Sequence, residues 1–269
     1  MTSASRGGGE VLVRINTGAD SAAGVVCVPH AGAGAAAYMP LGKMLGVPGW
    51  AARFPGRENR IRETPLPTIT AMADQLAAAI RDLDTDELVL FGHCSGALVA
   101  YEVALRLPDR NGLKLMASAC AAPGWRFDDS RPVAAMSDEE LAAQLAADGG
   151  TDETLLRNKS FVVMMLPVYR ADVLAVERYQ LGPERERLRI PVTVVAGKDD
   201  EDIPHAAFAA WARLVDGPFD IQLLDGGHFY LGQNERAVAG LLRHFLARSW
   251  AGARDDCHDE GPQACRGAD

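Results

Sequence analysis

The stretch of residues 88–107, LVLFGHCSGALVAYEVALRL, constrains the fold more than any other part of the chain. An apolar run typical of a buried strand leads directly into a His-Cys-Ser core flanked by two glycines, and an apolar helical pattern follows without a gap. A strand that turns sharply into a helix holds the central residue of the turn in strained backbone angles and presents its side chain at one end of the sheet. The residues two before and two after that centre must be small, because the strand and the helix pack closely there.

The glycines indicate which residue is central. With Cys94 at the centre, the two flanking positions are Gly92 and Gly96. With Ser95 at the centre, a histidine would occupy a position that has room only for a small residue. The sequence therefore favours Cys94 as a nucleophile, at a helix N-terminus that stabilises a thiolate. The alternative interpretation is a buried and inert cysteine.

Apolar runs and helical patterns alternate along the chain. The apolar runs lie at residues 11–15, 25–28, 88–91, 113–119, 191–196 and 220–224. Helical patterns lie at residues 68–83, 95–107, 204–216 and 235–249. Several apolar runs are continuous, which is typical of strands buried on both faces of a parallel sheet. The sequence therefore predicts an α/β fold, with a mostly parallel central sheet flanked by helices.

The segment of residues 123–189 breaks this alternation. It contains no convincing strand. Residues 137–150 begin with a capping box, and residues 158–181 form a long apolar helical pattern that we expect Pro167 to interrupt. Because the segment follows one predicted strand and precedes another, we interpret it as a helical lid. A pair of helices that only completes the core is the alternative.

The domain organisation follows from these patterns. We expect a single domain over residues 11–250, with the lid inserted into it. Residues 1–10 are rich in Gly and Ser and predict a flexible N-terminus. Residues 251–269 are polar and predict a disordered tail. The cysteines and histidine of that tail match no standard zinc-binding spacing.

The composition excludes several classes of function. A net charge of −9 and a pI near 5.2 argue against a nucleic-acid-binding protein, which would carry a basic surface. No apolar run reaches the roughly 18 residues that span a bilayer, and the first residues lack the apolar core of a signal peptide. The five cysteines are irregularly spaced and form no C-x-x-C pair. We therefore expect a cytoplasmic monomer that binds no nucleic acid, membrane, metal ion or redox cofactor.

A nucleophile of this kind requires a base and an acid that orients the base. In the order typical of this turn, the acid and then the histidine follow the nucleophile. The stretch PVTVVAGKDDEDIP places Asp199 and Asp200 just after a predicted strand. The spacing from Gly197 favours Asp200, with Asp199 as the close competitor and Asp202 less favoured. The stretch DIQLLDGGHFYLGQ places His228 in a glycine-lined turn between the last predicted strand and the last helix.

A tetrahedral intermediate also requires hydrogen-bond donors for its oxyanion, each contributing roughly 3–4 kcal/mol when well placed. One donor is the backbone N–H of the residue after the nucleophile, Ser95. The other is expected in the small-residue loop of VVCVPHAGAGA (25–35), where the Ala31 N–H is our candidate. A phosphate-binding loop is the alternative, but this loop has neither a Walker lysine nor a G-x-G-x-x-G pattern.

Five stretches in combination resemble the type II thioesterases that serve polyketide synthases and nonribosomal peptide synthetases. They are PHAGAGA (29–35), FPGRENRIRE (54–63), FGHCSGALVAYEVA (91–104), LPVYRADVLAVERY (166–179) and GGHFYL (226–231). The resemblance covers roughly residues 20–248 and implies an α/β-hydrolase fold. It places the nucleophile on Cys94, the acid on Asp200 and the base on His228. It also supports the two oxyanion donors named above and implies that the lid is mobile and covers an acyl channel.

The resemblance implies an enzyme that removes acyl groups from the phosphopantetheine arm of an acyl or peptidyl carrier protein, with no cofactor of its own. The sequence departs from the family at one position, because members usually carry serine, within G-H-S-M-G, where this chain carries Cys94. A serine would receive the acyl group as an oxygen ester. A cysteine receives it by thioester exchange, which is nearly balanced in energy.

This departure leaves the fate of the acyl group open. An acyl-cysteine can be hydrolysed, or it can be passed to an amine, hydroxyl or thiol if water is excluded. The alternatives to a thioesterase are therefore a non-hydrolytic acyltransferase or cyclase on the same scaffold. A non-catalytic carrier-binding protein is a third alternative, which the retained acid and histidine disfavour.

Two further groups of residues each have two interpretations. A cluster of arginines can either dock an acidic carrier protein or brace the active-site loops: Arg53, Arg57, Arg60 and Arg62. Four lid residues can either line the acyl channel or only pack within the lid: Met164, Met165, Leu166 and Tyr169. Methionine suits a channel for variable chains because its side chain is flexible.

Overall fold

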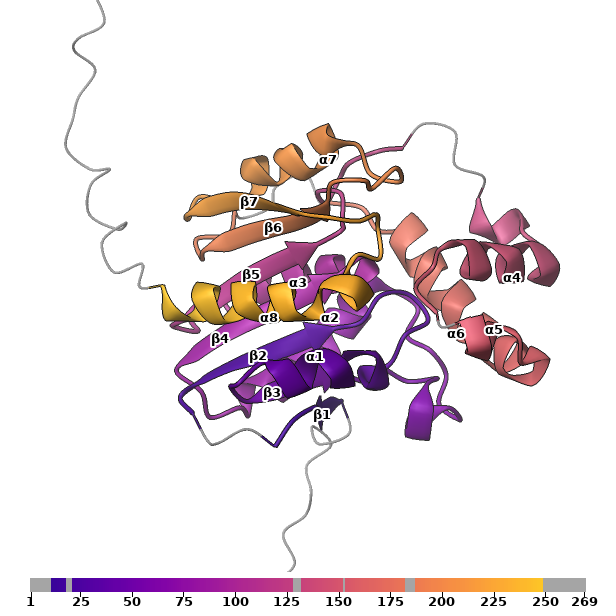
Figure 1. Ribbon diagram of the computed structural model, residues 1–269, viewed down its shortest axis with the longest axis horizontal. Helices are drawn as coiled ribbons and strands as arrows, with labels where there is room; N and C mark the ends of the chain where they lie inside the picture. The colour runs from indigo at the N-terminus through magenta and orange to yellow at the C-terminus, as the bar shows by residue number, and fades with distance from the viewer. Residues whose placement is uncertain (1–10, 18–20, 128–131, 152, 182–186, 249–269) are drawn as a thin grey trace, which may run out of the picture.

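A seven-stranded sheet forms the centre of the computed structural model (Figure 1). The structure describes residues 11–17, 21–127, 132–151, 153–181 and 187–248, so the predicted flexible start and disordered tail lie outside the described residues. The strands are β1 (Leu12–Arg14), β2 (Ala23–Val28), β3 (Gly49–Ala52), β4 (Glu87–His93), β5 (Leu113–Ser118), β6 (Val192–Gly197) and β7 (Phe219–Leu224).

The strand order is β1-β3-β2-β4-β5-β6-β7. β1 runs antiparallel to β3, and every other neighbouring pair is parallel, which confirms the predicted mostly parallel sheet. No apolar run predicted β3, because its residues GWAA include no β-branched side chain. β2 lies between β3 and β4, so the chain passes from β2 to β3 on one side and then crosses β2 to reach β4 on the other side. Open α/β sheets bind their ligands at such a point, beyond the carboxyl ends of the strands.

Helices cover both faces of the sheet, with α1 and α8 on one face and α2 and α3 on the other (Figure 1). Val25 and Cys27 of β2 belong to the core under α1 and α8. Val26 and Val28 belong to the core under α2 and α3, because successive side chains of a strand point to opposite faces. These helices are α1 (Met39–Met44), α2 (Ile69–Arg81), α3 (Ser95–Leu105) and α8 (Leu231–Ala247).

Shorter helical segments connect these elements. They are η1 (Ala35–Tyr38), η2 (Glu58–Arg60), η3 (Val133–Ala135), α7 (His205–Ala209) and η4 (Ala210–Leu214). The helix predicted over residues 204–216 is therefore a single short α-helix that continues as a 3-10 helix. Neither these segments nor any longer helix in the described ranges is apolar and long enough to cross a membrane.

The described residues 132–151 and 153–177 of the predicted lid segment, called the helical insertion below, lie beyond the carboxyl ends of the strands (Figure 1). In addition to η3, it contributes α4 (Asp138–Ala147), α5 (Glu153–Leu156) and α6 (Lys159–Glu177). The predicted capping box is present at the start of α4, where the Ser137 hydroxyl accepts a hydrogen bond from the Glu140 N–H and the Glu140 carboxylate accepts one from the Ser137 N–H. The insertion has a small core of its own, formed by Val133, Leu141, Leu145, Leu166 and Tyr169.

Pro167 does not interrupt α6, so this part of the prediction is wrong. A proline inside a helix deprives the carbonyl four residues earlier of its usual N–H partner. That residue here is Val163, which is 69% exposed, and Pro167 itself is exposed. Water can therefore replace the missing donor on this side of the helix, and the helix continues.

Candidate active site

Cys94 lies at the turn between β4 and α3, with a positive φ of 53° and a ψ of −125°. Its N–H donates a 2.8 Å hydrogen bond to the Ser118 carbonyl, and its side chain is half-buried. A Cβ atom on Gly92 would lie 2.3 Å from the Gly96 carbonyl oxygen. A Cβ atom on Gly96 would lie 2.1 Å from the Val28 carbonyl oxygen. Only glycine fits at both flanking positions, so the steric argument from the sequence has a direct counterpart in the structure.

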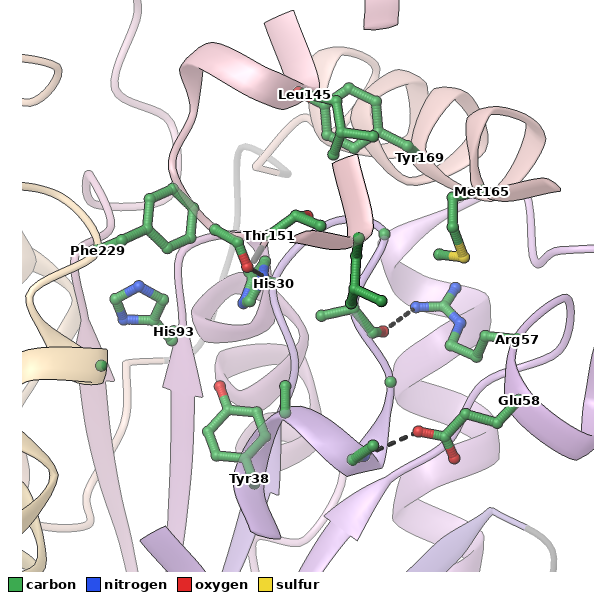
Figure 2. Close-up of a pocket in the computed structure, with 18 of the residues that line it drawn as sticks. His30, Tyr38, Arg57, Glu58, His93, Leu145, Thr151, Met165, Tyr169 and Phe229 are labelled. Atoms are coloured by element: carbon green, nitrogen blue, oxygen red, sulfur yellow. Dashed lines mark hydrogen bonds between the residues drawn. The ribbon is translucent and has the colours of Figure 1, made fainter. Parts of the chain in front are cut away.

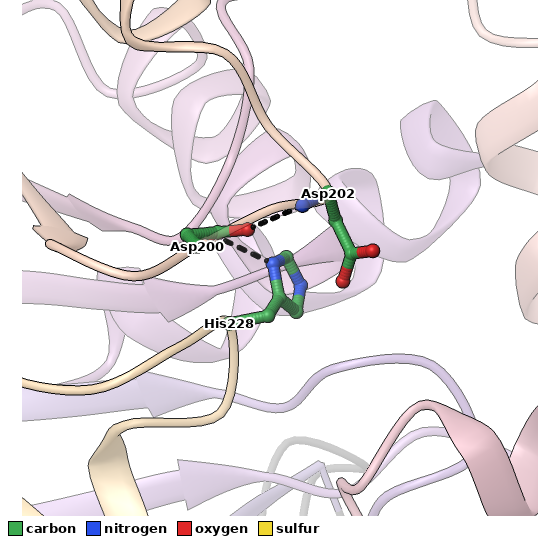
Figure 3. A group of neighbouring side chains, drawn as sticks. All are labelled: Asp200, Asp202 and His228. Carbon is green, nitrogen blue, oxygen red and sulfur yellow. Dashed lines mark hydrogen bonds and ion pairs between the residues drawn. The ribbon is translucent and has the colours of Figure 1, made fainter.

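His228 lies in the turn between β7 and α8, and Asp200 lies after β6 (Figure 3). The His228 Nδ1 atom donates to Asp200 Oδ2 at 3.0 Å. The Asp200 side chain is fully buried, and its second oxygen accepts N–H bonds from Asp202 and Ile203 at 3.0 and 3.2 Å. A Cβ atom on Gly197 would lie 2.3 Å from two carbonyl oxygens of the His228 turn, so glycine there lets the turn approach β6.

The competing carboxylates occupy different positions. Asp199 is exposed and accepts a hydrogen bond from the Gly226 N–H at 3.3 Å. Asp202 is exposed, and its carboxylate lies beside the His228 ring (Figure 3). Ligand atoms of Asp200, Asp202 and His228 lie within 4.8 Å of one another, a spacing at which they could hold a cation. The His228 Nδ1 atom is already engaged by Asp200, so the arrangement fits an acid–base pair better than a metal site.

His228 also interacts with Cys94, so the structure brings together all three residues that the sequence predicted for the triad. Burial lowers the pKa of the His228 imidazole. Its hydrogen bonds to Asp200 and Cys94, and the negative charges of these two groups, raise that pKa more strongly, to about 10. The raised pKa favours the imidazolium form of His228, which places a positive charge beside the Cys94 sulfur.

The two candidate oxyanion donors lie in segments that meet at this turn. Ser95 is the first residue of α3, and the first N–H groups of a helix have no carbonyl partner within it. Ala31 lies in the loop after β2. A Cβ atom on Gly96 would also lie 2.7 Å from the Pro29 carbonyl oxygen, so the start of this loop packs directly on the start of α3.

A cavity of about 600 Å³ lies between the helical insertion, the loop after β2 and the start of α8 (Figure 2). Three of the four channel candidates, Met164, Met165 and Tyr169, line it. Leu166 does not line it and is 8% exposed, because its side chain packs in the core of the insertion. The channel prediction is therefore wrong for Leu166, and the packing interpretation holds.

Two of the aromatic rings that line the cavity lie next to His228. His30, His93 and Phe229 line the cavity (Figure 2). The centroid of the His228 ring lies 5.9 Å from that of His93 and 5.0 Å from that of Phe229. His93 is fully buried, and its Nδ1 atom lies 2.7 Å from the Ser118 hydroxyl. The cavity lining therefore contacts the candidate base, although neither His228 nor Cys94 lines the cavity itself.

His30 contrasts with His228. Burial lowers the pKa of His30; its hydrogen bond to the Gly150 carbonyl opposes this, and the charges of His228 and Arg57 lower the pKa further, to about 4. The ring is therefore neutral at neutral pH. Its Nε2 atom lies 3.2 Å from the Gly150 carbonyl oxygen. Because a carbonyl only accepts, Nε2 carries the proton.

The chain matches the family described as "Thioesterase domain" over residues 23–248, most of its length. It belongs to the thioesterase domain family. It is 34% identical to the thioesterase PikA5 of Streptomyces venezuelae over 239 residues, which cover 87% of this chain and 84% of that protein. It is 36% identical to the phenyloxazoline synthase MbtB of Mycobacterium tuberculosis over 84% of this chain, but spans only 16% of the length of that relative.

Solved structures of thioesterases share this fold. The type II thioesterase BorB from the borrelidin biosynthetic cluster matches with a TM-score of 0.80 and 34% identity, over 88% of this chain and 97% of that chain. YbtT, a type II thioesterase from the yersiniabactin pathway, matches with a TM-score of 0.77 and 26% identity, over 87% of this chain and 98% of that chain. The predicted α/β-hydrolase fold is confirmed.

Two of the four arginines in the predicted cluster brace loops of this thioesterase domain. Arg57 and Arg60 are 2% and 7% exposed. Arg60 donates to the Arg53 carbonyl at 3.0 Å and pairs with the Glu63 carboxylate at 2.5 Å. Arg62 is exposed. Arg57 donates to the Ala33 carbonyl in the loop after β2, as the bracing interpretation expects, whereas Arg60 holds its own segment together and Arg62 is exposed.

Several residues at the site were not predicted from the sequence. Asp172, in the stretch LPVYRADVLAVERY, is 4% exposed and contacts the loop after β2. His30 and Phe229 line the cavity beside His228. The only available signal was that these residues lie inside the stretches that carry the resemblance, which identifies a position but not the atom it contacts.

Proposed function

We propose that this protein is a thioesterase that acts in trans on acyl groups held as thioesters on the phosphopantetheine of an acyl or peptidyl carrier protein, in polyketide or nonribosomal peptide biosynthesis. The observation that carries the proposal is the position of Cys94 at the strained turn, next to His228. The His228 ring is in turn hydrogen-bonded to the buried Asp200. Family membership supports thioester chemistry, and the printed descriptions of BorB and YbtT support the type II class.

On this proposal, the Cys94 thiolate attacks the carbonyl carbon of the carrier thioester and forms a new S–C bond. The carbonyl oxygen becomes an oxyanion, which the N–H groups of Ala31 and Ser95 stabilise. When the intermediate collapses, the bond to the phosphopantetheine sulfur breaks, and that sulfur takes the proton of His228. The acyl group is now a thioester of Cys94, and the carrier protein leaves.

Deacylation repeats these steps with water. His228 accepts a proton from a water molecule, whose oxygen attacks the acyl-cysteine carbonyl. Cys94 then leaves as a thiolate, and the product is a free acid. The cavity beside His228 supports this proposal because its lining is mainly apolar and can hold an acyl chain during both steps.

Transfer of the acyl group to another acceptor is the second candidate function, and the thiol of Cys94 favours it. An acyl-cysteine remains as activated as the carrier thioester, so an amine, hydroxyl or thiol can discharge it if the site excludes water. An acyltransferase or a cyclase would use the same triad. The two functions differ only in the molecule that attacks the second time.

The test is incubation of the protein with a chemically acylated carrier protein, with and without added amine, hydroxyl or thiol acceptors. The proposal expects deacylated carrier protein and free acid as the product. Transfer products in place of free acid would establish the second candidate. Cys94→Ala is the control, and loss of all turnover is expected. No turnover by the wild type, together with carrier binding that is unchanged in Cys94→Ala, would instead support a non-catalytic carrier-binding protein.

A further inference from the structure

A buried carboxylate on α6 contacts the loop that carries Ala31. Asp172 lies in the helical insertion and is 4% exposed. Its Oδ2 atom accepts a hydrogen bond from the Gly32 N–H at 2.8 Å, although the two residues are 140 positions apart in the chain. Its Oδ1 atom accepts a hydrogen bond from Arg57 Nη2 at 3.0 Å. One carboxylate therefore joins the insertion to the peptide that directly follows Ala31.

Arg57 forms hydrogen bonds both to Asp172 and to the loop that carries Ala31. Its Nη1 atom donates to the Ala33 carbonyl at 2.8 Å, while its Nη2 atom holds Asp172. The planar guanidinium fixes these two partners relative to each other. Gly32 has a φ of +76°, and a Cβ atom there would lie 3.3 Å from the Tyr169 ring. The loop therefore adopts a glycine conformation directly against α6.

The insertion also contacts the start of the same loop. The His30 Nε2 atom donates to the Gly150 carbonyl, between α4 and α5, at 3.2 Å. Ala31 itself packs against the small core of the insertion. Each residue from 30 to 33 is thus held by the insertion or by the Arg57–Asp172 pair. The backbone of Ala31 lies at the centre of these contacts.

We infer that Asp172 is a positioning residue, which sets the Ala31 N–H at the distance and angle that the oxyanion requires and makes the oxyanion hole depend on the docking of α6. This inference rests on the proposed function. Buried ion pairs contribute little net stability compared with apolar residues of the same volume. The buried Arg57–Asp172 pair holds the Gly32 N–H in one orientation, which a pair of apolar side chains cannot do.

The variant Asp172→Asn tests the inference. It keeps the shape of the side chain but removes the charge that holds Arg57. We expect the rate of Cys94 acylation by an acylated carrier protein to fall about 10- to 100-fold, because small misplacements of a reacting group or donor have effects of this size. KM is expected to change little. The matched control is Asp138→Asn, which removes another ion pair to α6, with Arg170 at 2.8 Å, away from this loop.

A second readout separates positioning from a merely structural role. Octanal forms a hemithioacetal when the Cys94 thiol adds across its C=O bond and the thiol proton passes to the oxygen, which then occupies the oxyanion site. Octanamide binds without this reaction. Asp172→Asn is expected to weaken octanal binding by the same factor as the acylation rate and to leave octanamide binding within about threefold. Equal weakening of both ligands, or wild-type values for both, would overturn the inference.

If Asp172→Asn does not fold, Arg57→Lys provides the same comparison, because lysine keeps the positive charge but cannot bridge the Ala33 carbonyl and Asp172 together. The same octanal-specific loss is expected, and its absence counts against the inference. Failure of the proposed function is distinguishable. In that case the wild-type protein itself forms no acyl-Cys94, whereas failure of the inference alone leaves wild-type acylation intact and unchanged in both variants.

Discussion

The carboxyl end of the sheet and the helical insertion border the same cavity but are packed differently. At the end of the sheet, Cβ atoms on Gly96 or Gly197 would lie 2.1 to 2.3 Å from backbone oxygens, so the backbone segments there are closely packed. The insertion has only a small core of its own. It also leaves Val163 and Met164 69% and 47% exposed on α6.

The end of the sheet and the helical insertion have different roles in the proposed reaction. Residues that must hold reacting atoms within tenths of an ångström are at the rigid end of the sheet. The residues proposed to surround the acyl chain belong to the insertion, which has a small core and exposed apolar side chains on α6. The loop of residues 30–33 is where the two regions touch. Variants in each region should therefore affect different measurements.

Asp200→Asn is expected to have the largest effect, because it removes the charge that orients His228 at the rigid end of the sheet. The rate of acyl release should fall about 10³- to 10⁴-fold, with little change in KM. Asp202→Asn, whose carboxylate lies beside the same ring but is exposed, should change the rate less than about threefold. Steady-state kinetics with one acylated carrier protein decides this, and equal losses in the two variants would contradict the assignment.

Gly96→Ala tests the rigidity of the same region. The new Cβ atom would lie 2.1 Å from a backbone oxygen, so we expect a loss of at least about 3 kcal/mol in the free energy of unfolding. Gly240→Ala, in α8, is the control, because apart from neighbouring residues of its own helix no atom lies within 4 Å of its Cβ position. That variant should be stabilised by about 0.5–1 kcal/mol, since alanine favours a helix. Urea denaturation of both variants measures the contrast, and a stable Gly96→Ala would show that the turn is not close-packed.

Neighbouring residues in the insertion should behave differently from each other. Met165→Ala enlarges the cavity, so it should shift the preferred acyl chain towards longer chains, at about 0.8 kcal/mol for each CH₂ group gained. Leu166→Ala should lower the free energy of unfolding by about 2 kcal/mol and leave the chain preference unchanged, because Leu166 is in the core of the insertion. Competition between acyl chains of different length, with a parallel denaturation curve, separates the two. A selectivity change in Leu166→Ala would mean that it lines the channel after all.

The parts of the fold that the sequence predicted are those set by local sterics. Two glycines around Cys94 leave one register for the turn, and the capping box at Ser137 identifies the start of α4 without reference to the rest of the chain. The chain order of nucleophile, acid and histidine places Asp200 and His228 after strands whose carboxyl ends meet. These features needed no knowledge of tertiary contacts.

The parts that could not be predicted depend on distant partners. Asp172 looks like an ordinary polar residue of a helix, and only the folded chain brings it to Gly32. Pro167 looks like a helix breaker, and only the exposure of Val163 shows why α6 continues. β3 was not predicted because its residues GWAA do not form a recognisable apolar run. They are buried by the neighbouring strands of the sheet.

The smallest expected effect concerns His30, in the loop after β2, and His228, in the turn before α8. The pKa of His30 is lowered to about 4, so its neutral form is favoured by folding, and the protein loses stability as the pH falls from about 6.5 towards 4. His228 has the opposite sign. Its pKa is raised to about 10, so its contribution is complete below about 6.5 and is lost as the pH rises towards 10. His30→Phe should flatten the acid side of the stability curve only.

Thermal unfolding between pH 4 and 10 measures the loss of stability on the acid side and on the alkaline side, in the wild type and in His30→Phe. Cys94→Ser is the companion variant, because a neutral hydroxyl removes the charge that helps to raise the pKa of His228, and that pKa should fall. NMR titration of the His228 ring measures it directly. Two results would show that these causes of the pKa shifts are wrong. One is that His30→Phe loses as much stability at acid pH as the wild type does. The other is that the pKa of His228 is unchanged in Cys94→Ser.

Mass spectrometry can identify the residue that receives the acyl group, which we expect to be Cys94. The protein is mixed with an acylated carrier protein, quenched in acid within one turnover, and measured intact and after proteolysis. The account predicts a mass increase of one acyl group, located on Cys94 and absent from Cys94→Ala. An acyl group on Ser95, or no adduct on a protein that still releases free acid, would contradict it.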